Sequence, residues 1–231
     1  MQSAQDLLHV LARDHRRFDE RCRAFLDAPT RRGERLLRGL AIDLLSHEAI
    51  EQLLLHPLVA QRLPTGRELA ASRLEEEDLL ERMLLTALRR PIASEAFRSA
   101  FQGAHRHLIE HTDREELEVF PYLRHVADRR ELRELGRLYT TLMVRVPTRL
   151  NLRLEPEDVT QRRPLLRIRD AACDVLRELG QPLPDGVAPG RDEIAAPVQG
   201  LVIDVSGPPV AEPSPSVPAS SPVEPAAVPR G

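Results

Sequence analysis

The chain has 231 residues, of which 42% are hydrophobic and only 3% are aromatic, with no tryptophan. Its core must therefore consist mainly of Leu, Ala and Val, a composition that favours packed helices over a β-sandwich. The 33 basic and 36 acidic residues leave a net charge of −3, which excludes the overall basic surplus of a typical nucleic-acid-binding protein.

The lengths of the apolar runs and the spacing of the two cysteines indicate the compartment in which the protein works. No run reaches the roughly 18 apolar residues that a membrane span needs, and the N-terminus lacks the basic start of a targeting signal. Cys22 and Cys173 are far apart and have no CxxC partner, so neither a zinc site nor a disulfide framework is indicated. We expect a cytoplasmic protein without membrane or nucleic-acid partners.

The first predicted helix spans residues 3–27 and places a histidine in its buried stripe. Apolar positions recur at alternating steps of three and four, which is the period of an amphipathic helix. The stripe contains Leu8, Leu11, His15, Phe18, Cys22 and Phe25. Taken alone, a buried histidine such as His15 is more often a hydrogen-bonded core residue than a ligand.

The second predicted helix follows Pro29 and Gly33, and its stripe carries a histidine and a glutamate at successive core positions. The stripe is Leu37, Leu40, Leu44, His47, Glu51, Leu54 and Leu58. An ionised glutamate without partners is costly to bury, and it would usually become neutral instead. A bound cation removes this cost, so His47 and Glu51 are candidate metal ligands.

The third predicted helix runs from about residue 68 to residue 89 and contains an acidic cluster at 75–78. The ordinary interpretation of such a cluster is a solvated face. The apolar stripe through Leu74, Leu84, Leu85 and Leu88 nevertheless leaves Asp78 and Glu81 close to the buried seam. Periodicity alone does not exclude Glu77.

The fourth predicted helix opens at Ser94 and repeats the pattern of the second. Its stripe is Phe97, Phe101, Ala104, Leu108, His111, Glu115, then Glu118 or Val119, and Tyr122. His111 and Glu115 are four residues apart, as His47 and Glu51 are, so each pair points to one side of its helix. A proline follows each histidine by ten residues. His105, His107 and His125 fit the stripe less well, and we expect them at the surface or the rim.

The spacing of the two pairs indicates a duplicated helical hairpin. His47 and His111 are 64 residues apart. An offset of 63 or 64 residues takes His15 to Asp78 or Leu79, and Asp78 is the chemically sensible match. The predicted metal ligands are therefore His15, His47, Glu51, Asp78, His111 and Glu115.

The rest of the chain changes in character after the fourth helix. Residues 130–144 are amphipathic and can pack on the bundle as a fifth helix, residues 165–179 indicate a short helix, and residues 198–205 resemble a strand. The segment 207–231 is rich in Pro, Ala, Ser and Val, which predicts an extended, disordered tail. We therefore expect a helical bundle over 1–146, an irregular extension over 147–206 and a tail over 207–231.

These elements predict an all-α fold, an antiparallel up-down four-helix bundle whose core can hold metal between facing helices. Mixed nitrogen and oxygen donors suit iron, manganese or zinc better than calcium or copper(I). A carboxylate from each half can bridge two cations because it has two oxygens, which favours a dinuclear site.

Three stretches resemble the hemerythrin-like, HHE cation-binding domain over roughly residues 5–125. They are Leu11 to His15, His47 to Glu51 with Pro57, and His111 to Glu116 ending Val119-Phe120-Pro121. The resemblance implies a four-helix bundle with a non-haem di-iron centre, in which His15, His47, Glu51, His111 and Glu115 would be ligands. The chain departs from the family at Asp78, where a histidine usually follows the glutamates.

Three functions follow as hypotheses. The first is a metal-binding protein whose di-iron or related site binds or senses oxygen, nitric oxide or peroxide. The second is a helical interaction module with a degenerate metal site, which docks protein partners through its C-terminal region. The third, a di-iron oxidase or peroxide-consuming enzyme, ranks lower because the sequence shows no separate general base or substrate pocket.

Overall fold

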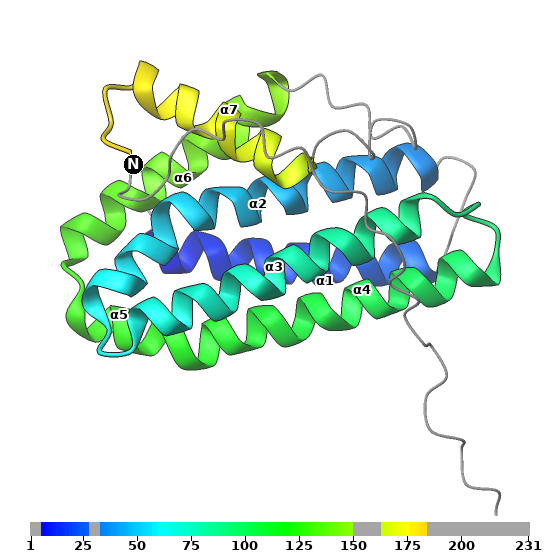
Figure 1. Ribbon diagram of the computed structural model, residues 1–231, viewed down its shortest axis with the longest axis horizontal. Coiled ribbons are helices and arrows are strands. Elements are labelled where there is room, and N and C mark those ends of the chain that lie inside the picture. Colours follow the sequence, from blue (N-terminus) through cyan, green and yellow to red (C-terminus); the bar gives the residue numbers. More distant parts are fainter. Residues whose placement is uncertain (1–5, 28–32, 150–162, 184–231) are drawn as a thin grey trace, which may run out of the picture. The chain divides into compact units, whose positions relative to one another are not determined.

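The computed structural model describes residues 6–27, 33–149 and 163–183, and all of its regular elements are helices. Within these residues there is no strand, which confirms the predicted all-α class. None of the described helices combines the length and the apolarity that crossing a bilayer requires. The elements are α1 (Leu7–Asp27), α2 (Gly33–Arg62), α3 (Gly66–Leu88), α4 (Glu95–Arg114), the π-helical turn η1 (Glu115–Val119), α5 (Phe120–Val126), α6 (Arg129–Arg149) and α7 (Pro164–Glu178) (Figure 1).

Helices α1 to α4 form the predicted up-down bundle, with successive helices running in opposite directions (Figure 1). Each packs against its neighbours around the ring, α1 on α2, α2 on α3, α3 on α4 and α4 on α1. The turn between α2 and α3 is tight, because a Cβ atom on Gly66 would lie 2.0 Å from the carbonyl oxygen of Val59. At the start of α4, the Ser94 side chain accepts a hydrogen bond from the Phe97 amide, so Ser94 caps the helix predicted to open there.

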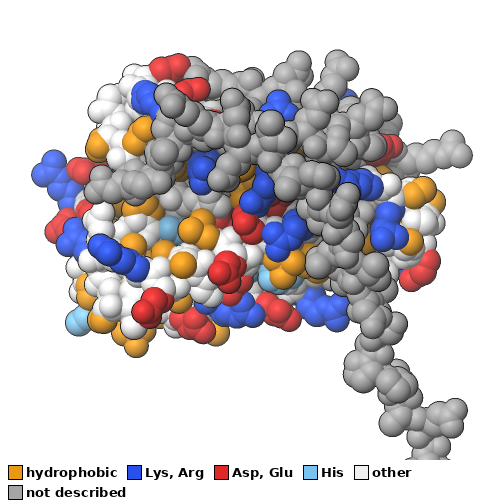
Figure 2. All heavy atoms as spheres, in the orientation of Figure 1, with side chains coloured by type: hydrophobic (Ala, Val, Ile, Leu, Met, Phe, Trp, Pro, Cys, Tyr) orange, Lys and Arg blue, Asp and Glu red, His pale blue; other side chains and the backbone are white. Residues whose placement is uncertain are grey.

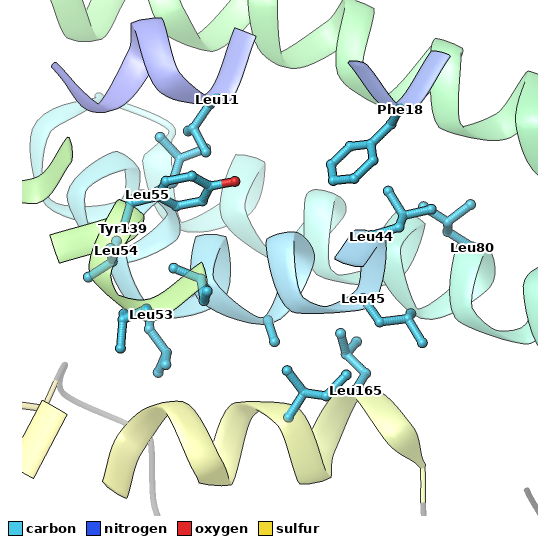
Figure 3. Packing of buried hydrophobic residues seen from close by; sticks show 14 of the residues in the cluster. Leu11, Phe18, Leu44, Leu45, Leu53, Leu54, Leu55, Leu80, Tyr139 and Leu165 are labelled. Atoms are coloured by element: carbon cyan, nitrogen blue, oxygen red, sulfur yellow. The ribbon is translucent and has the colours of Figure 1, made fainter. Parts of the chain in front are cut away.

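Two further helices cover the outside of α2. Helix α6 packs on α1 and α2, and α7 packs on α2 and α6, so the helices expected near 130–144 and 165–179 are both present. Figure 3 shows Leu165 of α7 pointing toward Leu45 of α2. As a result α2 has few exposed residues along its middle, and every residue from 44 to 56 is buried. The predicted strand at 198–205 and the tail at 207–231 lie outside the described residues.

A buried carboxylate fixes the start of α7. Glu81 of α3 accepts hydrogen bonds from the Leu165 amide at 2.7 Å and from Arg163 Nε at 2.8 Å. Pro164 occupies the first turn of α7, where its missing N–H leaves no donor unsatisfied. Glu81 therefore caps α7 and also lies at the positive end of its helix dipole.

The π-helical turn η1, which follows α4, changes which of the subsequent residues face the core. The Phe120 amide donates to the carbonyl oxygen of Glu115, five residues earlier. Pro121 cannot donate a hydrogen bond, and its ring would clash with the carbonyl four residues back in a regular helix. The extra residue in the turn places Leu123 inward and leaves Tyr122 61% exposed. The prediction that Tyr122 belongs to the buried stripe is therefore wrong.

The buried face of α3 also differs from the predicted stripe. Leu74 is 37% exposed, although the sequence pattern placed it inward. The buried residues of α3 are Gly66, Ala70, Arg73, Glu77, Leu80, Glu81, Leu84, Leu85 and Ala87. Leu84 and Leu85 are inward as predicted, but charged residues fill three of these nine positions, so a pattern of apolar residues alone does not define the buried face in the first half of this helix.

The described surface carries charges of both signs. Figure 2 shows acidic and basic side chains interspersed on one face of the molecule. Ion pairs join neighbouring helices, for example Arg62 of α2 with Glu131 of α6 at 3.1 Å. Exposed pairs of this kind contribute little to stability one by one, so the buried residues hold the bundle together.

Replacement of Glu81 tests the attachment of α7. In Glu81→Ala the Leu165 amide and the Arg163 guanidinium lose a buried acceptor, so we expect the free energy of unfolding to fall by about 2–3 kcal/mol. Chemical denaturation followed by circular dichroism measures the change. Glu75→Ala, at an exposed position of the same helix, is the matched control and should shift stability by less than about 0.5 kcal/mol. Equal stability of the two variants would contradict the proposed cap.

Candidate metal centre

Seven histidine and glutamate side chains, types that can bind a metal, point from the four bundle helices and the start of η1 into the middle of the bundle. None is more than 4% exposed. We name them the donor cluster, and they are His15 of α1, His47, Glu48 and Glu51 of α2, Glu77 of α3, His111 of α4 and Glu115 at the first residue of η1. So many ionisable groups can be buried together only if they are neutralised by protons, by each other or by a cation.

The cluster arises because helices bring residues four apart onto one side. His47 Nε2 lies 3.4 Å from an oxygen of Glu51, and His111 Nε2 lies 3.8 Å from an oxygen of Glu115. Across helices, His15 Nε2 lies 3.5 Å from the other oxygen of Glu115. Since metal–ligand bonds measure about 2.0–2.2 Å, ligand atoms on one ion lie roughly 3 Å or slightly more apart. These separations are therefore near those of atoms that share an ion.

The outer nitrogen, Nδ1, of each histidine in the cluster already has a partner. His15 Nδ1 lies 2.9 Å from Glu116 Oε1, and His111 Nδ1 lies 2.9 Å from Glu76 Oε2. His47 Nδ1 lies 2.6 Å from the Tyr139 hydroxyl. The inner nitrogen, Nε2, of all three rings is buried without a hydrogen-bond partner. This arrangement is the usual one for metal-binding histidines, which donate the second ring N–H to a neighbouring acceptor.

Tyr139 of α6 determines which nitrogen of His47 carries the proton. Its hydroxyl lies 2.9 Å from Asp14 Oδ2 as well as 2.6 Å from His47 Nδ1. The Asp14 carboxylate can only accept, and the hydroxyl has one hydrogen, so Tyr139 donates to Asp14 and accepts from the Nδ1–H of His47. The Nε2 atom of His47 is then left with a free lone pair facing Glu51.

Electrostatics keep this pair in the protonation states that binding needs. Burial, followed by the Asp14 carboxylate, raises the pKa of Tyr139 well above its usual value, so the phenol stays protonated. Burial lowers the pKa of His47 well below its usual value, and the nearby His15 and His111 lower it further. A neutral imidazole is the form that can coordinate a metal.

Protons balance the carboxylates elsewhere in the cluster. Burial opposes a charge on His15, but the carboxylates of Glu116 and Glu51 outweigh it and raise its pKa to about 10. Burial also opposes a charge on His111, yet Glu115 raises its pKa well above the usual value. Burial and the neighbouring Glu115 raise the pKa of Glu51 well above its usual value. A divalent cation would neutralise the same carboxylates by displacing these protons.

The residues present fit a pair of cations. Both oxygens of Glu48, Glu51 and Glu115 are buried without a hydrogen-bond partner, and no arginine pairs with them in the described part of the chain. Two groups have ligand atoms within 4.8 Å of one another. The first is His15, His47 and Glu51, and the second is Glu48, Glu51, Glu77 and His111. The groups share Glu51, and the two oxygens of Glu115 face one histidine of each group.

The structure brings together five of the six residues that the sequence predicted as ligands: His15, His47, Glu51, His111 and Glu115. It does not bring Asp78 to them. Asp78 is 38% exposed and pairs with Arg163 at the start of α7. Glu77 provides the inward carboxylate of α3 instead, because a shift of one residue turns a side chain by about 100° around a helix. The offset inferred from the duplication was therefore one residue too long for this helix.

Several residues around the site have no signal in the apolar pattern. Glu48 lies beside His47 in the sequence, but a single stripe excludes it, and α2 is buried on more than one side. Gln52 donates to Glu77 Oε2 at 2.7 Å, and His56 Nε2 lies 2.9 Å from Glu77 Oε1. Two further carboxylates contact the site indirectly. Asp14 accepts a hydrogen bond from Tyr139, and Glu116 is the partner of His15 Nδ1. Glu48, Gln52 and His56 could be found only from the complete burial of the middle of α2, on which α6 and α7 pack.

Removal of the Tyr139 hydroxyl tests its role in orienting His47. Tyr139→Phe leaves the His47 Nδ1–H without an acceptor, so we expect metal affinity to fall about 10- to 100-fold. Competition with a chromophoric chelator measures the affinity, and the ¹⁵N shifts of His47 report its tautomer, which a purely structural role would not change. Tyr122→Phe is the control, since Tyr122 is the only other tyrosine and is exposed. Unchanged affinity together with an unchanged tautomer would rule out the orienting role.

Comparison with known proteins agrees with this geometry. The sequence model of the Hemerythrin HHE cation binding domain matches residues 6–123. No curated protein and no solved structure matches the chain. The match covers a little over half of the chain and includes every residue of the donor cluster, but it ends before α6 and Tyr139. The chain belongs to the hemerythrin HHE cation-binding family.

Proposed function

We propose that the chain binds two non-haem metal ions, with iron as the principal metal, and through them binds or senses oxygen, nitric oxide or peroxide. One observation carries the proposal. Three imidazole nitrogens and the oxygens of several carboxylates converge in the bundle interior, buried and without hydrogen-bond partners. Native proteins rarely leave buried polar atoms unsatisfied, so such a group of unpaired ligand atoms is typical of a cation-binding site.

Charge balance supports a pair of ions over a single one. Glu48, Glu51, Glu77 and Glu115 are four carboxylates with at most 1% exposure. When all four are ionised, two divalent cations supply the four positive charges that neutralise them. A single divalent cation leaves two buried negative charges, which only protons on neighbouring groups such as His56, 2.9 Å from Glu77, could then balance.

The donor types support iron, with manganese or zinc as the other suitable metals. Imidazole suits iron and zinc, and carboxylate suits manganese. His15, His47, Glu48, Glu51, Glu77, His111 and Glu115 would hold the ions. A bound di-iron pair would supply redox chemistry and open coordination positions for a small ligand.

The surroundings of the donor cluster favour a small ligand. The ring of His15 stacks on Phe120 at a centroid distance of 5.9 Å, and Phe18 meets the ring of His47 edge-on at 5.2 Å. These apolar neighbours and the low exposure of the donors exclude a bulky substrate unless the helices separate. A diatomic gas or peroxide needs far less space.

The alternative of a degenerate site in an interaction module loses one of its two supports. That hypothesis drew on the Pro-rich tail and on Asp78 as a replacement for a metal-binding histidine, and Asp78 instead pairs with Arg163. A protein partner for the C-terminal region stays a prediction, because residues 184–231 lie outside the described part of the chain. An oxidase or peroxide-consuming activity likewise stays a hypothesis.

Metal loading of the purified full chain tests the first part of the proposal. After treatment with a chelator and anaerobic incubation with ferrous iron, we expect about two iron ions per chain and a higher melting temperature, because a cation that binds only the folded state stabilises it. Elemental analysis and thermal unfolding provide the measurements. His47→Ala should lose iron, whereas His125→Ala, at an exposed position, should not. Less than about 0.2 iron per chain with an unchanged melting temperature would exclude metal binding.

Exposure of the iron-loaded chain to small ligands tests the second part. We expect the optical spectrum to change on addition of oxygen, nitric oxide or peroxide, because the open positions of the iron pair would be occupied. The chelator-treated chain is the control and should show no change. If the spectrum of the iron-loaded chain does not respond to any of the three, the proposal of metal binding stands and the proposal of ligand binding is contradicted.

A further inference from the structure

The geometry points to two unequal cation positions, and we propose that the carboxylate-rich position accepts Mn²⁺ while the imidazole-rich position holds a nitrogen-preferring ion such as Zn²⁺ or Fe²⁺. The chain would then be able to hold a mixed metal pair. This inference rests on the proposed function, since it assumes that both positions bind metal. It concerns the choice of metal at each position.

The two groups of ligand atoms differ in composition. The first group has two imidazoles and one carboxylate, from His15, His47 and Glu51. The second reverses this ratio, with one imidazole and three carboxylates, and its members are Glu48, Glu51, Glu77 and His111. Because Glu51 is common to both groups, the difference comes from the remaining residues, two histidines in one case and two glutamates with one histidine in the other.

Glu77 is the residue that gives the second position its character. Its Oε2 accepts a hydrogen bond from Gln52 at 2.7 Å, which fixes the carboxylate against α2. Its Oε1 is buried and lies 2.9 Å from His56 Nε2, so an ion at the second position would take this oxygen from its contact with His56. His56 itself lies outside the second group, and the donor count of that group is therefore unchanged.

Donor type determines which metal each position selects. Zn²⁺ and Fe²⁺ bind more tightly than Mn²⁺ to most mixed sites, and imidazole strengthens this preference whereas carboxylate suits Mn²⁺. The advantage of Zn²⁺ over Mn²⁺ should thus be large at His15 and His47 and small at Glu48 and Glu77. When zinc is scarce, it fills the first position and leaves the second to manganese.

Loading with a limited amount of zinc tests the proposal on the full chain. The chelator-treated protein receives one equivalent of Zn²⁺ and an excess of Mn²⁺, and native mass spectrometry then gives the share of chains that carry each pair of metals. Electron paramagnetic resonance of Mn²⁺ reports its surroundings. We expect most chains to carry one zinc and one manganese, with the manganese signal of an isolated ion next to a non-magnetic one.

Replacement of Glu77 by histidine should give the two positions a similar preference for zinc over manganese. In Glu77→His the second position gains an imidazole, so zinc should compete there and bound manganese should fall to a minor share when two equivalents of zinc are given. Glu75→His introduces the same side chain at an exposed position of α3 and should behave as the unaltered chain does. If Glu77→His does not fold, Glu77→Gln keeps the shape of the side chain and should lose manganese while one zinc remains.

The outcomes separate this inference from the proposed function. Chains that bind neither zinc nor manganese would overturn this inference, and chains that also bind no iron would overturn the proposed function as well. A random 1:2:1 distribution of zinc pairs, mixed pairs and manganese pairs would show that the two positions have the same metal preference. That result would overturn the inference and leave the metal-binding function intact. A Glu77→His variant that folds and retains the manganese of the unaltered chain would show that Glu77 does not set the selectivity, and would overturn the inference in the same way.

Discussion

The burial of four carboxylates at the centre of a helical bundle is the constraint on which the rest of the structure depends. An isolated charge in such a place is unstable, and neutralisation by protons or by a metal is the only remedy that the surrounding apolar side chains allow. The bundle is therefore organised around a polar centre that its hydrophobic residues cannot stabilise. The surrounding leucine-rich core provides the folding free energy, and the centre holds the side chains that could bind a metal.

The positions of the inward donors are held from outside the centre. Each histidine of the cluster is fixed by an acceptor on another helix, Glu116 after α4, Glu76 on α3 or Tyr139 on α6. The second of these acceptors is itself held by Arg114. Because the supporting contacts cross between helices, movement of one helix would reorient a ring on another. The orientation of the candidate ligands consequently depends on how the helices pack against one another.

The sequence is sufficient to predict the parts of the site that follow from helical period. Pairs such as His47 and Glu51 are determined by a spacing of four residues, and His15 by its place in an apolar stripe. Glu77 and Tyr139 depend on how separate helices are rotated against each other, which local pattern does not encode. Charged residues at inward positions of α3 hide its phase. Pro121 predicts an interruption of the fourth helix, but the register that follows depends on the π-helical turn.

Tyr139 lies on α6, beyond the region that matches the family. The unit defined by sequence similarity is thus smaller than the unit that forms the complete site. A fragment ending at residue 123 would retain every inward donor but would lose the hydroxyl that joins His47 to Asp14, and it would expose the apolar faces of α1 and α2 that α6 covers. For this chain the boundary of the shared domain is no guide to where the protein can be divided.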